Sequence, residues 1–132
     1  AIPEPALQEL LTCMSHIGIA YQIADDMLNL CRTDSLGKGT IAEDLHERKY
    51  TLAVDALRKH PQFMSLYFTD QKSPAVIARM LDIIEEEAVV EQCLGEAQRQ
   101  SELAMAAAER LQCPRSKEAL RLFIGFVVER RK

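Results

Sequence analysis

Apolar residues recur at every third or fourth position from Pro5 to about Cys31. This stripe comprises Leu10, Cys13, Met14, Ile17, Ala20, Tyr21, Ala24, Met27, Leu28 and Cys31. Side chains with that spacing lie on one face of an α-helix, so the segment predicts one long amphipathic helix. No convincing strand pattern occurs elsewhere in the chain. The sequence therefore predicts an all-α fold, a helical bundle in which the stripe is buried against other helices.

The remaining segments read as shorter helices separated by loops. Residues 32–48 are rich in glycine and polar side chains and predict mostly loop, with one short turn around residues 42–45. Thr51 can cap a helix over residues 52–59, because its hydroxyl can accept from a backbone N–H in the first turn. Pro61 is predicted to end that helix.

The second half of the chain carries further helix-start signals. Ser73 precedes a proline, which is typical of a helix start, and the apolar spacing then continues to residue 111. Glu85–Glu87 and Gly95 weaken that pattern, which favours two helices over one, and this acidic run is interpreted as a solvated helix face. Pro114 breaks the chain again, and Ser116 can cap a last helix.

Length and composition favour one folded domain over residues 1–132. The 132 residues are 48% hydrophobic but only 5% aromatic, enough for a core of aliphatic side chains. The formal net charge is −4, with no long basic run, so a nucleic-acid partner is not predicted.

The four cysteines are scattered without a CxxC pair, and the three histidines lack metal-ligand spacing. We interpret the cysteines as reduced thiols of a cytoplasmic protein and propose no zinc site. No stretch approaches the roughly 18 apolar residues of a spanning helix, and the chain opens without a signal-peptide pattern. A soluble chain with no membrane span is predicted.

Two adjacent carboxylates stand near the end of the long helix. At about 100° per residue, Gln22, Asp25, Asp26 and Asn29 share one face, nearly opposite the apolar stripe. Paired carboxylates repel by roughly 1 kcal/mol at 4 Å in water. Mg²⁺ would remove that cost, because it binds through one or two carboxylates and takes further ligands from water and substrate phosphates. The pattern predicts half of a magnesium site; the alternative is the solvated face of an amphipathic helix.

Two lysines follow this face along the chain. Lys38 and Lys49 bracket a polar segment containing Asp44, and Lys49 stands just ahead of the capped helix start, which itself favours an anion. Lysine contacts phosphate oxygens as a point charge. These residues predict contacts to a diphosphate.

Together these motifs resemble the C-terminal half of the trans-isoprenyl diphosphate synthases, the polyprenyl synthetase family. GIAYQIADDMLN, residues 18–29, resembles the second aspartate-rich motif of that family. LGKGTIAEDLHERKYTL, residues 36–52, resembles the segment that follows it, and EALRLFIGFVVERR, residues 118–131, resembles the family's C-terminal ending. The resemblance implies the C-terminal half of an isoprenoid synthase fold.

The family resemblance also implies a reaction. Members join isopentenyl diphosphate to an allylic diphosphate by magnesium-assisted ionisation, followed by attack of the alkene on the allylic cation. The site residues that it implies are Asp25, Asp26 and Asn29 as metal ligands, Gln22, Lys38 and Lys49 as substrate contacts, and Asp25, Asp26 and Lys38 as catalytic residues.

The chain also departs from the family pattern. Asn29 replaces the usual third aspartate, Arg48 stands where a glycine precedes the lysine, and no segment matches the first aspartate-rich motif. We therefore expect a prenyltransferase component that needs a partner chain supplying the first motif, in a homo- or hetero-oligomer. The alternative is a noncatalytic regulatory or interaction subunit of a heteromeric prenyl diphosphate synthase. A terpene cyclase and a plain helical adaptor explain the aspartates and lysines less well.

Overall fold

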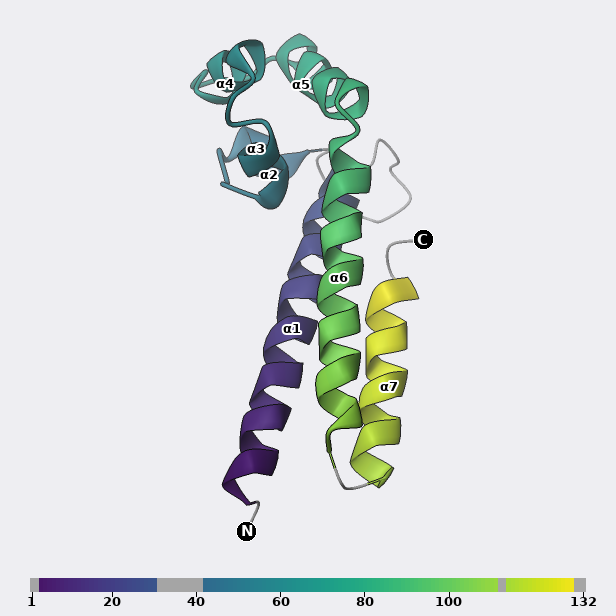
Figure 1. The fold of residues 1–132 in the computed structure, drawn as a ribbon. Coiled ribbons are helices and arrows are strands. Elements are labelled where there is room, and N and C mark those ends of the chain that lie inside the picture. Colours follow the sequence, from purple (N-terminus) through teal and green to yellow (C-terminus); the bar gives the residue numbers. More distant parts are fainter. Residues whose placement is uncertain (1–2, 31–41, 112–113, 130–132) are drawn as a thin grey trace. The chain divides into compact units, whose positions relative to one another are not determined.

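The computed structural model describes residues 3–30, 42–111 and 114–129, and these are helical with no strand (Figure 1). The all-α prediction is confirmed. The helices are α1 (Glu4–Asn29), α2 (Glu43–His46), α3 (Leu52–Ala56), α4 (Pro61–Tyr67), α5 (Pro74–Glu86), α6 (Val89–Glu109) and α7 (Pro114–Glu129). None of them is long and apolar enough to cross a bilayer, within the described residues.

The chain divides into two compact units. Unit 1 comprises Ala1–Asp25 and Leu94–Lys132, and unit 2 comprises Asp26–Cys93. Helices α1 and α6 each contribute to both units. The expectation of one domain over residues 1–132 remains a prediction.

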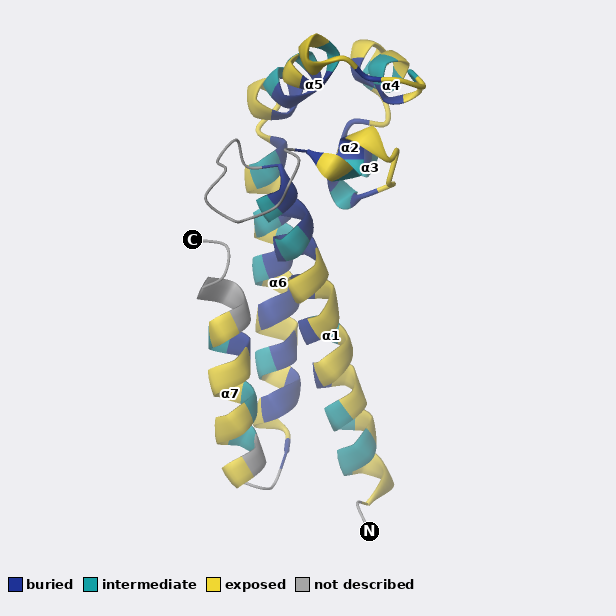
Figure 2. Ribbon diagram, turned by 180° about the vertical axis from the view of Figure 1, so that it is seen from behind, coloured by how far each residue is buried: buried dark blue, intermediate teal, exposed yellow. Residues whose placement is uncertain are grey.

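Unit 1 is built from α1, α6 and α7, which lie side by side in both ribbon views (Figures 1 and 2). Its core consists of the buried residues Cys13, Ile17, Ala20, Ala104, Ala107, Ala108 and Ile124, with Met105 and Leu120 packed against them. Alanine on the facing surfaces of α1 and α6 lets the helix backbones approach closely, so this core contains little bulk. Cys13, Ile17 and Ala20 of the predicted stripe supply the α1 half of this core. Burial of the whole stripe was predicted and is wrong for Met14 and Tyr21, which are 46% and 42% exposed.

Unit 2 packs shorter helices around larger side chains. Phe63, Leu45, Met80, Ile83 and Val54 are fully buried there. The dark blue positions on α4 and α5 in Figure 2 belong to this core.

Several predicted helix boundaries are confirmed. The long helix spans Glu4–Asn29, and α2 occupies the predicted short turn. Thr51 caps α3, since its Oγ1 accepts from the N–H of Val54 at 3.4 Å. Residues 31–41, the rest of the predicted loop, lie outside the described part of the chain.

Pro61 begins a helix rather than merely ending one, and the prediction missed this helix. Helix α3 ends at Ala56, and α4 starts with Pro61 at its first position. Proline suits that position because the N–H it lacks would have no partner inside the helix. The ring of His60 takes the place of a capping hydroxyl: its Nδ1 accepts from the N–H of Phe63 at 3.1 Å.

The second half also follows most of the prediction. Ser73 caps α5 by accepting from the N–H of Val76 at 3.3 Å, and two helices occupy the stretch that begins there. The chain turns between them at Ala88, whose φ of 53° is left-handed. The predicted cap at Ser116 is wrong, because α7 already begins at Pro114.

The described cysteines agree with the reduced-thiol prediction. Cys13 and Cys93 are both free and buried, and each behaves as a small apolar side chain. Cys31 and Cys113 lie outside the described residues.

Candidate functional site

The acidic face lies on the last two turns of α1. Gln22 is exposed and Asp25 is half-buried, whereas Asp26 and Asn29 are only 8% and 7% exposed. The alternative of a solvated helix face is therefore wrong for Asp26 and Asn29. Sequence periodicity placed them opposite the apolar stripe, but at this end of α1 the neighbouring side chains Ile23 and Leu30 are buried as well.

Asn29 holds the start of α2. Its Oδ1 accepts from the N–H of Asp44 at 3.1 Å, and its backbone carbonyl accepts from the N–H of Ala42 at 3.2 Å. An amide oxygen has two lone pairs, so one remains for a further donor or a cation. Within unit 2, the end of α1 is thus fixed directly to the segment that leads to Lys49.

Asp26 influences a buried thiol in the same unit. The pKa of Cys93 is raised to about 11, mainly because burial disfavours the thiolate and further because the Asp26 carboxylate is negative. The thiol therefore stays protonated at neutral pH, which makes it a poor nucleophile.

The backbone of Lys49 is fixed by a hydrogen bond, whereas its side chain is half-exposed and makes one long ion pair. Its N–H donates to the carbonyl of Asp44 at 2.9 Å, and its Nζ lies 3.9 Å from Asp44 Oδ1. The Lys49 side chain is 51% exposed, so this ion pair contributes little to stability. An ammonium group in such a position can reach an anionic ligand.

The residue before Lys49 adopts a backbone conformation that suits glycine. Arg48 has φ of 54°, in the left-handed region, which costs a non-glycine residue roughly 1 kcal/mol. Its carbonyl accepts from the hydroxyl of Tyr67 at 2.8 Å. Arg48 stands where the resembled pattern has a glycine, and a positive φ is a conformation that glycine adopts without strain.

One expectation about this segment needs correction. The helix that Thr51 caps, α3, is only five residues long, so its dipole adds little to anion binding. The exposed Lys49 side chain supplies a positive charge for a phosphate in this segment.

A match to a known family covers most of these residues. The family model described as "Polyprenyl synthetase" matches residues 2–84, well over half of the chain. The chain belongs to the polyprenyl synthetase family. Gln22, Asp25, Asp26, Asn29, Lys38 and Lys49 all fall inside the matched range.

Individual relatives agree with this assignment. A prenyl transferase of Cyanophora paradoxa is 32% identical over 117 residues, which cover 87% of this chain and 36% of the relative. A geranylgeranyl pyrophosphate synthase from Corynebacterium glutamicum, solved with calcium and isoprenyl diphosphate, matches with a TM-score of 0.76 and 25% identity. That match covers 92% of this chain and 39% of the solved one, so the chain spans less than two fifths of either relative.

The donor set of this polyprenyl synthetase chain fits a hard cation. Two carboxylates and one amide oxygen on α1 are the oxygen ligands that Mg²⁺ and Ca²⁺ prefer. Among the described residues, no group of three or more His, Cys, Asp or Glu side chains could hold a metal by itself. A cation on this face would take its remaining ligands from water, substrate or other protein residues.

Not every predicted residue can be placed. Lys38 lies outside the described residues. Tyr67, by contrast, was missed in the sequence, because its contact with Arg48 joins positions 19 residues apart that no short motif connects.

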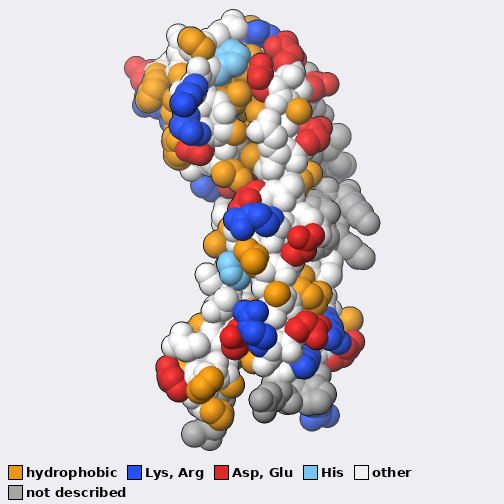
Figure 3. All heavy atoms as spheres, viewed as in Figure 1, with side chains coloured by type: hydrophobic (Ala, Val, Ile, Leu, Met, Phe, Trp, Pro, Cys, Tyr) orange, Lys and Arg blue, Asp and Glu red, His pale blue; other side chains and the backbone are white. Residues whose placement is uncertain are grey.

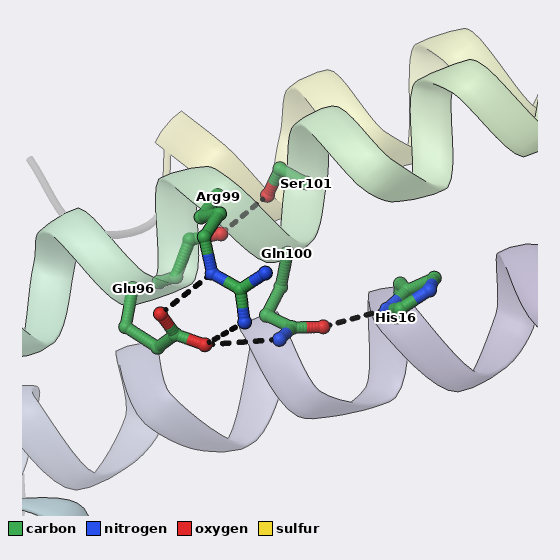
Figure 4. A network of polar contacts seen from close by, with 6 residues as sticks. His16, Glu96, Arg99, Gln100 and Ser101 are labelled. Atoms are coloured by element: carbon green, nitrogen blue, oxygen red, sulfur yellow. Dashed lines mark hydrogen bonds and ion pairs between the residues drawn. The ribbon is translucent and has the colours of Figure 1, made fainter.

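A second polar cluster lies on α1 and α6 in unit 1 (Figure 4). His16 Nδ1 lies 2.6 Å from Gln100 Oε1, and Gln100 Nε2 donates to Glu96 Oε1 at 3.0 Å. Since the amide N–H groups of Gln100 point to Glu96, the His16 ring must donate. Arg99 completes the cluster through two bonds to the Glu96 carboxylate, at 2.9 and 2.6 Å. The Nδ1–H group of His16 is thus part of a hydrogen-bond network that joins α1 to α6.

Charged side chains are otherwise dispersed. On the face shown in Figure 3, acidic and basic groups are interspersed among the described residues. The Glu85–Glu87 run is exposed, as expected for a solvated helix face.

Proposed function

We propose that this chain is a component of a prenyltransferase that condenses isopentenyl diphosphate with an allylic diphosphate to make a longer polyprenyl diphosphate. The observation that carries the proposal is the buried end of α1, where Asp26 and Asn29 lie in a chain of the polyprenyl synthetase family. A solvated helix end would have no need to bury these two polar groups.

Asp25 and Asp26, with Asn29, would hold the divalent cation, which we propose is Mg²⁺. When bound, the cation supplies positive charge that stabilises the departing diphosphate. Calcium and isoprenyl diphosphate in the solved Corynebacterium relative support a cation and a diphosphate as ligands.

Electrostatics supports the same assignment. Asp25 and Asp26 are adjacent carboxylates, and Asp26 is buried. Repulsion between two such charges exceeds roughly 1 kcal/mol where solvent is partly excluded. A bound cation would offset that repulsion.

The chain's own cations would bind and orient the substrate. Lys49 is exposed and held at its backbone by Asp44, so it can donate to diphosphate oxygens. We assign Lys38 the same role and Gln22 a contact to substrate. Their combined effect is to fix the leaving group beside the acidic face before ionisation.

We propose that the first aspartate-rich motif comes from another polypeptide or from sequence beyond these 132 residues. The chain spans 36% and 39% of two relatives. Exposed apolar side chains in unit 1 favour burial against further protein: Leu122, Phe123 and Phe126 on α7 are 68%, 45% and 60% exposed. Apolar groups clustered in this way are typical of contact surfaces, and a homo- or hetero-oligomer would cover them.

A noncatalytic subunit of a heteromeric synthase is the second candidate. Asn29 lacks the charge of the family's third aspartate, and its side-chain oxygen already accepts from Asp44. This arrangement keeps the fold of the site even without a metal. In either case we place the protein in the cytoplasm, in line with the free thiols of Cys13 and Cys93.

Calorimetric titration of inorganic diphosphate in the presence of Mg²⁺ tests the binding half of this proposal. The wild-type chain should bind, and Asp25→Asn/Asp26→Asn should weaken binding at least tenfold. Glu85→Gln/Glu87→Gln removes two carboxylates from the exposed acidic run and should leave binding unchanged. Equal affinities for all three proteins, or no binding by the wild type, would show that the acidic face does not bind diphosphate.

A further inference from the structure

Tyr67 is a buried tyrosine whose hydroxyl reaches a distant loop. It is the last residue of α4 and only 5% exposed, and its hydroxyl donates to the carbonyl of Arg48 at 2.8 Å. Both residues lie in unit 2. The contact therefore joins the α4 core to the turn that immediately precedes Lys49.

Backbone hydrogen bonds also hold this turn. Arg48 and Lys49 are exposed, and the backbone bonds around them are Arg48 N–H to Leu45 O at 3.3 Å and Lys49 N–H to Asp44 O at 2.9 Å. The backbone of Arg48 is in the left-handed conformation, which is strained for a residue other than glycine. Its peptide group therefore needs more support than that of a relaxed backbone. The Tyr67 hydroxyl supplies that support to the carbonyl of the Arg48–Lys49 peptide.

The Tyr67 ring is itself held on several sides. It stacks on Phe63 with centroids 6.5 Å apart and meets Phe68 edge-on at 5.2 Å. The Lys72 ammonium lies 6.0 Å from the ring centroid and donates to the carbonyl of Thr69 at 2.8 Å. A ring fixed in this way places its hydroxyl at one point.

Lys72 and Arg48 add a second constraint. Burial lowers the pKa of Lys72, and the nearby positive charge of Arg48 lowers it further. Repulsion between these two cations disfavours movement of Arg48 toward Lys72, while Asp70 pairs with Arg48 at 3.3 Å.

We propose that Tyr67 is a positioning residue for diphosphate binding: its hydroxyl fixes the left-handed Arg48 turn and so directs Lys49 toward the diphosphate. This inference rests on the proposed role of Lys49. Phenylalanine would fill the same space in the core, so the hydroxyl is needed for the turn and not for packing.

The test compares hydroxyl-deletion variants by calorimetric titration of inorganic diphosphate with Mg²⁺. Tyr67→Phe should weaken binding about fivefold, the effect of one lost hydrogen bond. Tyr50→Phe is the matched control, because Tyr50 is next to Lys49 but its hydroxyl donates to Asp55, and it should not change the affinity. Lys49→Ala should weaken binding more, and adding Tyr67→Phe to it should have no further effect.

Amide hydrogen exchange at Lys49 gives a readout that does not depend on ligand. Tyr67→Phe should speed exchange of this amide, which donates to Asp44, while the amides of α5 keep their protection. Arg48→Gly in the same background should restore slow exchange and affinity, because glycine adopts a positive φ without strain. If Tyr67→Phe alone folds poorly, the double variant Arg48→Gly/Tyr67→Phe can be measured in its place.

The outcomes distinguish the proposed role of Lys49 in binding from the proposed role of Tyr67 in positioning. If Lys49→Ala leaves diphosphate binding unchanged, the proposed role of Lys49 fails, whatever the exchange rates show. If Lys49→Ala weakens binding but Tyr67→Phe changes neither affinity nor Lys49 exchange, the positioning role of Tyr67 is overturned and the proposed function stands.

Discussion

At the scale of single residues, Glu96 shows how a few neighbours fix a charge. Hydrogen bonds from Arg99 and then Gln100 lower the pKa of its carboxyl from 4.5 to about 2. The same carboxylate orients Gln100, which in turn accepts from His16 on α1. An ion pair within α6 thereby sets the tautomer of a histidine on the neighbouring helix.

The lowered pKa of Glu96 predicts a pH dependence of stability. A carboxyl whose folded-state pKa is depressed stabilises the fold above its unfolded pKa and loses that contribution as pH falls. The loss should therefore occur between pH 4.5 and about 2. The side chain is 33% exposed, and solvent screening limits the effect to about 1 kcal/mol.

Urea unfolding at several pH values checks this prediction. Between about pH 5 and pH 3, the unfolding free energy of wild type should fall more than that of Glu96→Gln. Glu91→Gln, an exposed acid on the same helix, should behave like wild type. If the unfolding free energies of wild type and Glu96→Gln fall equally with pH, the Glu96 carboxylate does not stabilise the fold through its lowered pKa.

At the scale of helices, the turn between α5 and α6 has an unusual residue. Helix α5 ends at Glu86 with Glu87 as its cap, and Ala88 follows with φ of 53°. Glycine is the common residue at this position after a helix, because it has no Cβ to clash in the left-handed conformation. Alanine there costs stability.

We predict that Ala88→Gly raises the unfolding free energy by about 0.5–1 kcal/mol, since it removes this strain. The same substitution at Ala106, an exposed position inside α6, should lower it by about 1 kcal/mol. Denaturant midpoints of both variants check the prediction. Destabilisation by both would mean that the turn gains nothing from glycine.

Local signals in the sequence predicted much of the helix pattern. Thr51 and Ser73 cap helices as their chemistry suggests. The existence of α4 was missed because Pro61 was interpreted as an end, although a proline suits the first position of a helix equally well. The cap at His60 could not be foreseen, since imidazole is not a usual capping group.

The candidate site was predictable only in part, for a similar reason. Helical spacing predicted that Asp25, Asp26 and Asn29 share a face of α1. The surroundings of Asp26 and Asn29 include residues far along the chain: the Asp44 N–H donates to Asn29, and the Asp26 carboxylate raises the pKa of Cys93. Periodicity within one helix contains no information about such contacts.

For the whole molecule, two findings bear on function: the chain belongs to a known family, and it covers only part of the length of its relatives. The chain matches the polyprenyl synthetase family over residues 2–84 and spans 39% of a solved relative. Its acidic face offers two carboxylates, and Leu122 and Phe126 are exposed on α7. These observations support the proposal that this chain forms one part of a prenyl transfer site and that further protein completes it.

Incorporation of labelled isopentenyl diphosphate into prenyl products tests that claim most directly. The chain would be assayed with Mg²⁺ and an allylic diphosphate, alone and mixed with the portion of the Cyanophora relative that it does not match. We predict activity only in the mixture, and its loss with Asp25→Asn/Asp26→Asn but not with Glu85→Gln/Glu87→Gln. Absence of product in every combination, or activity that survives loss of both aspartates, would contradict the account.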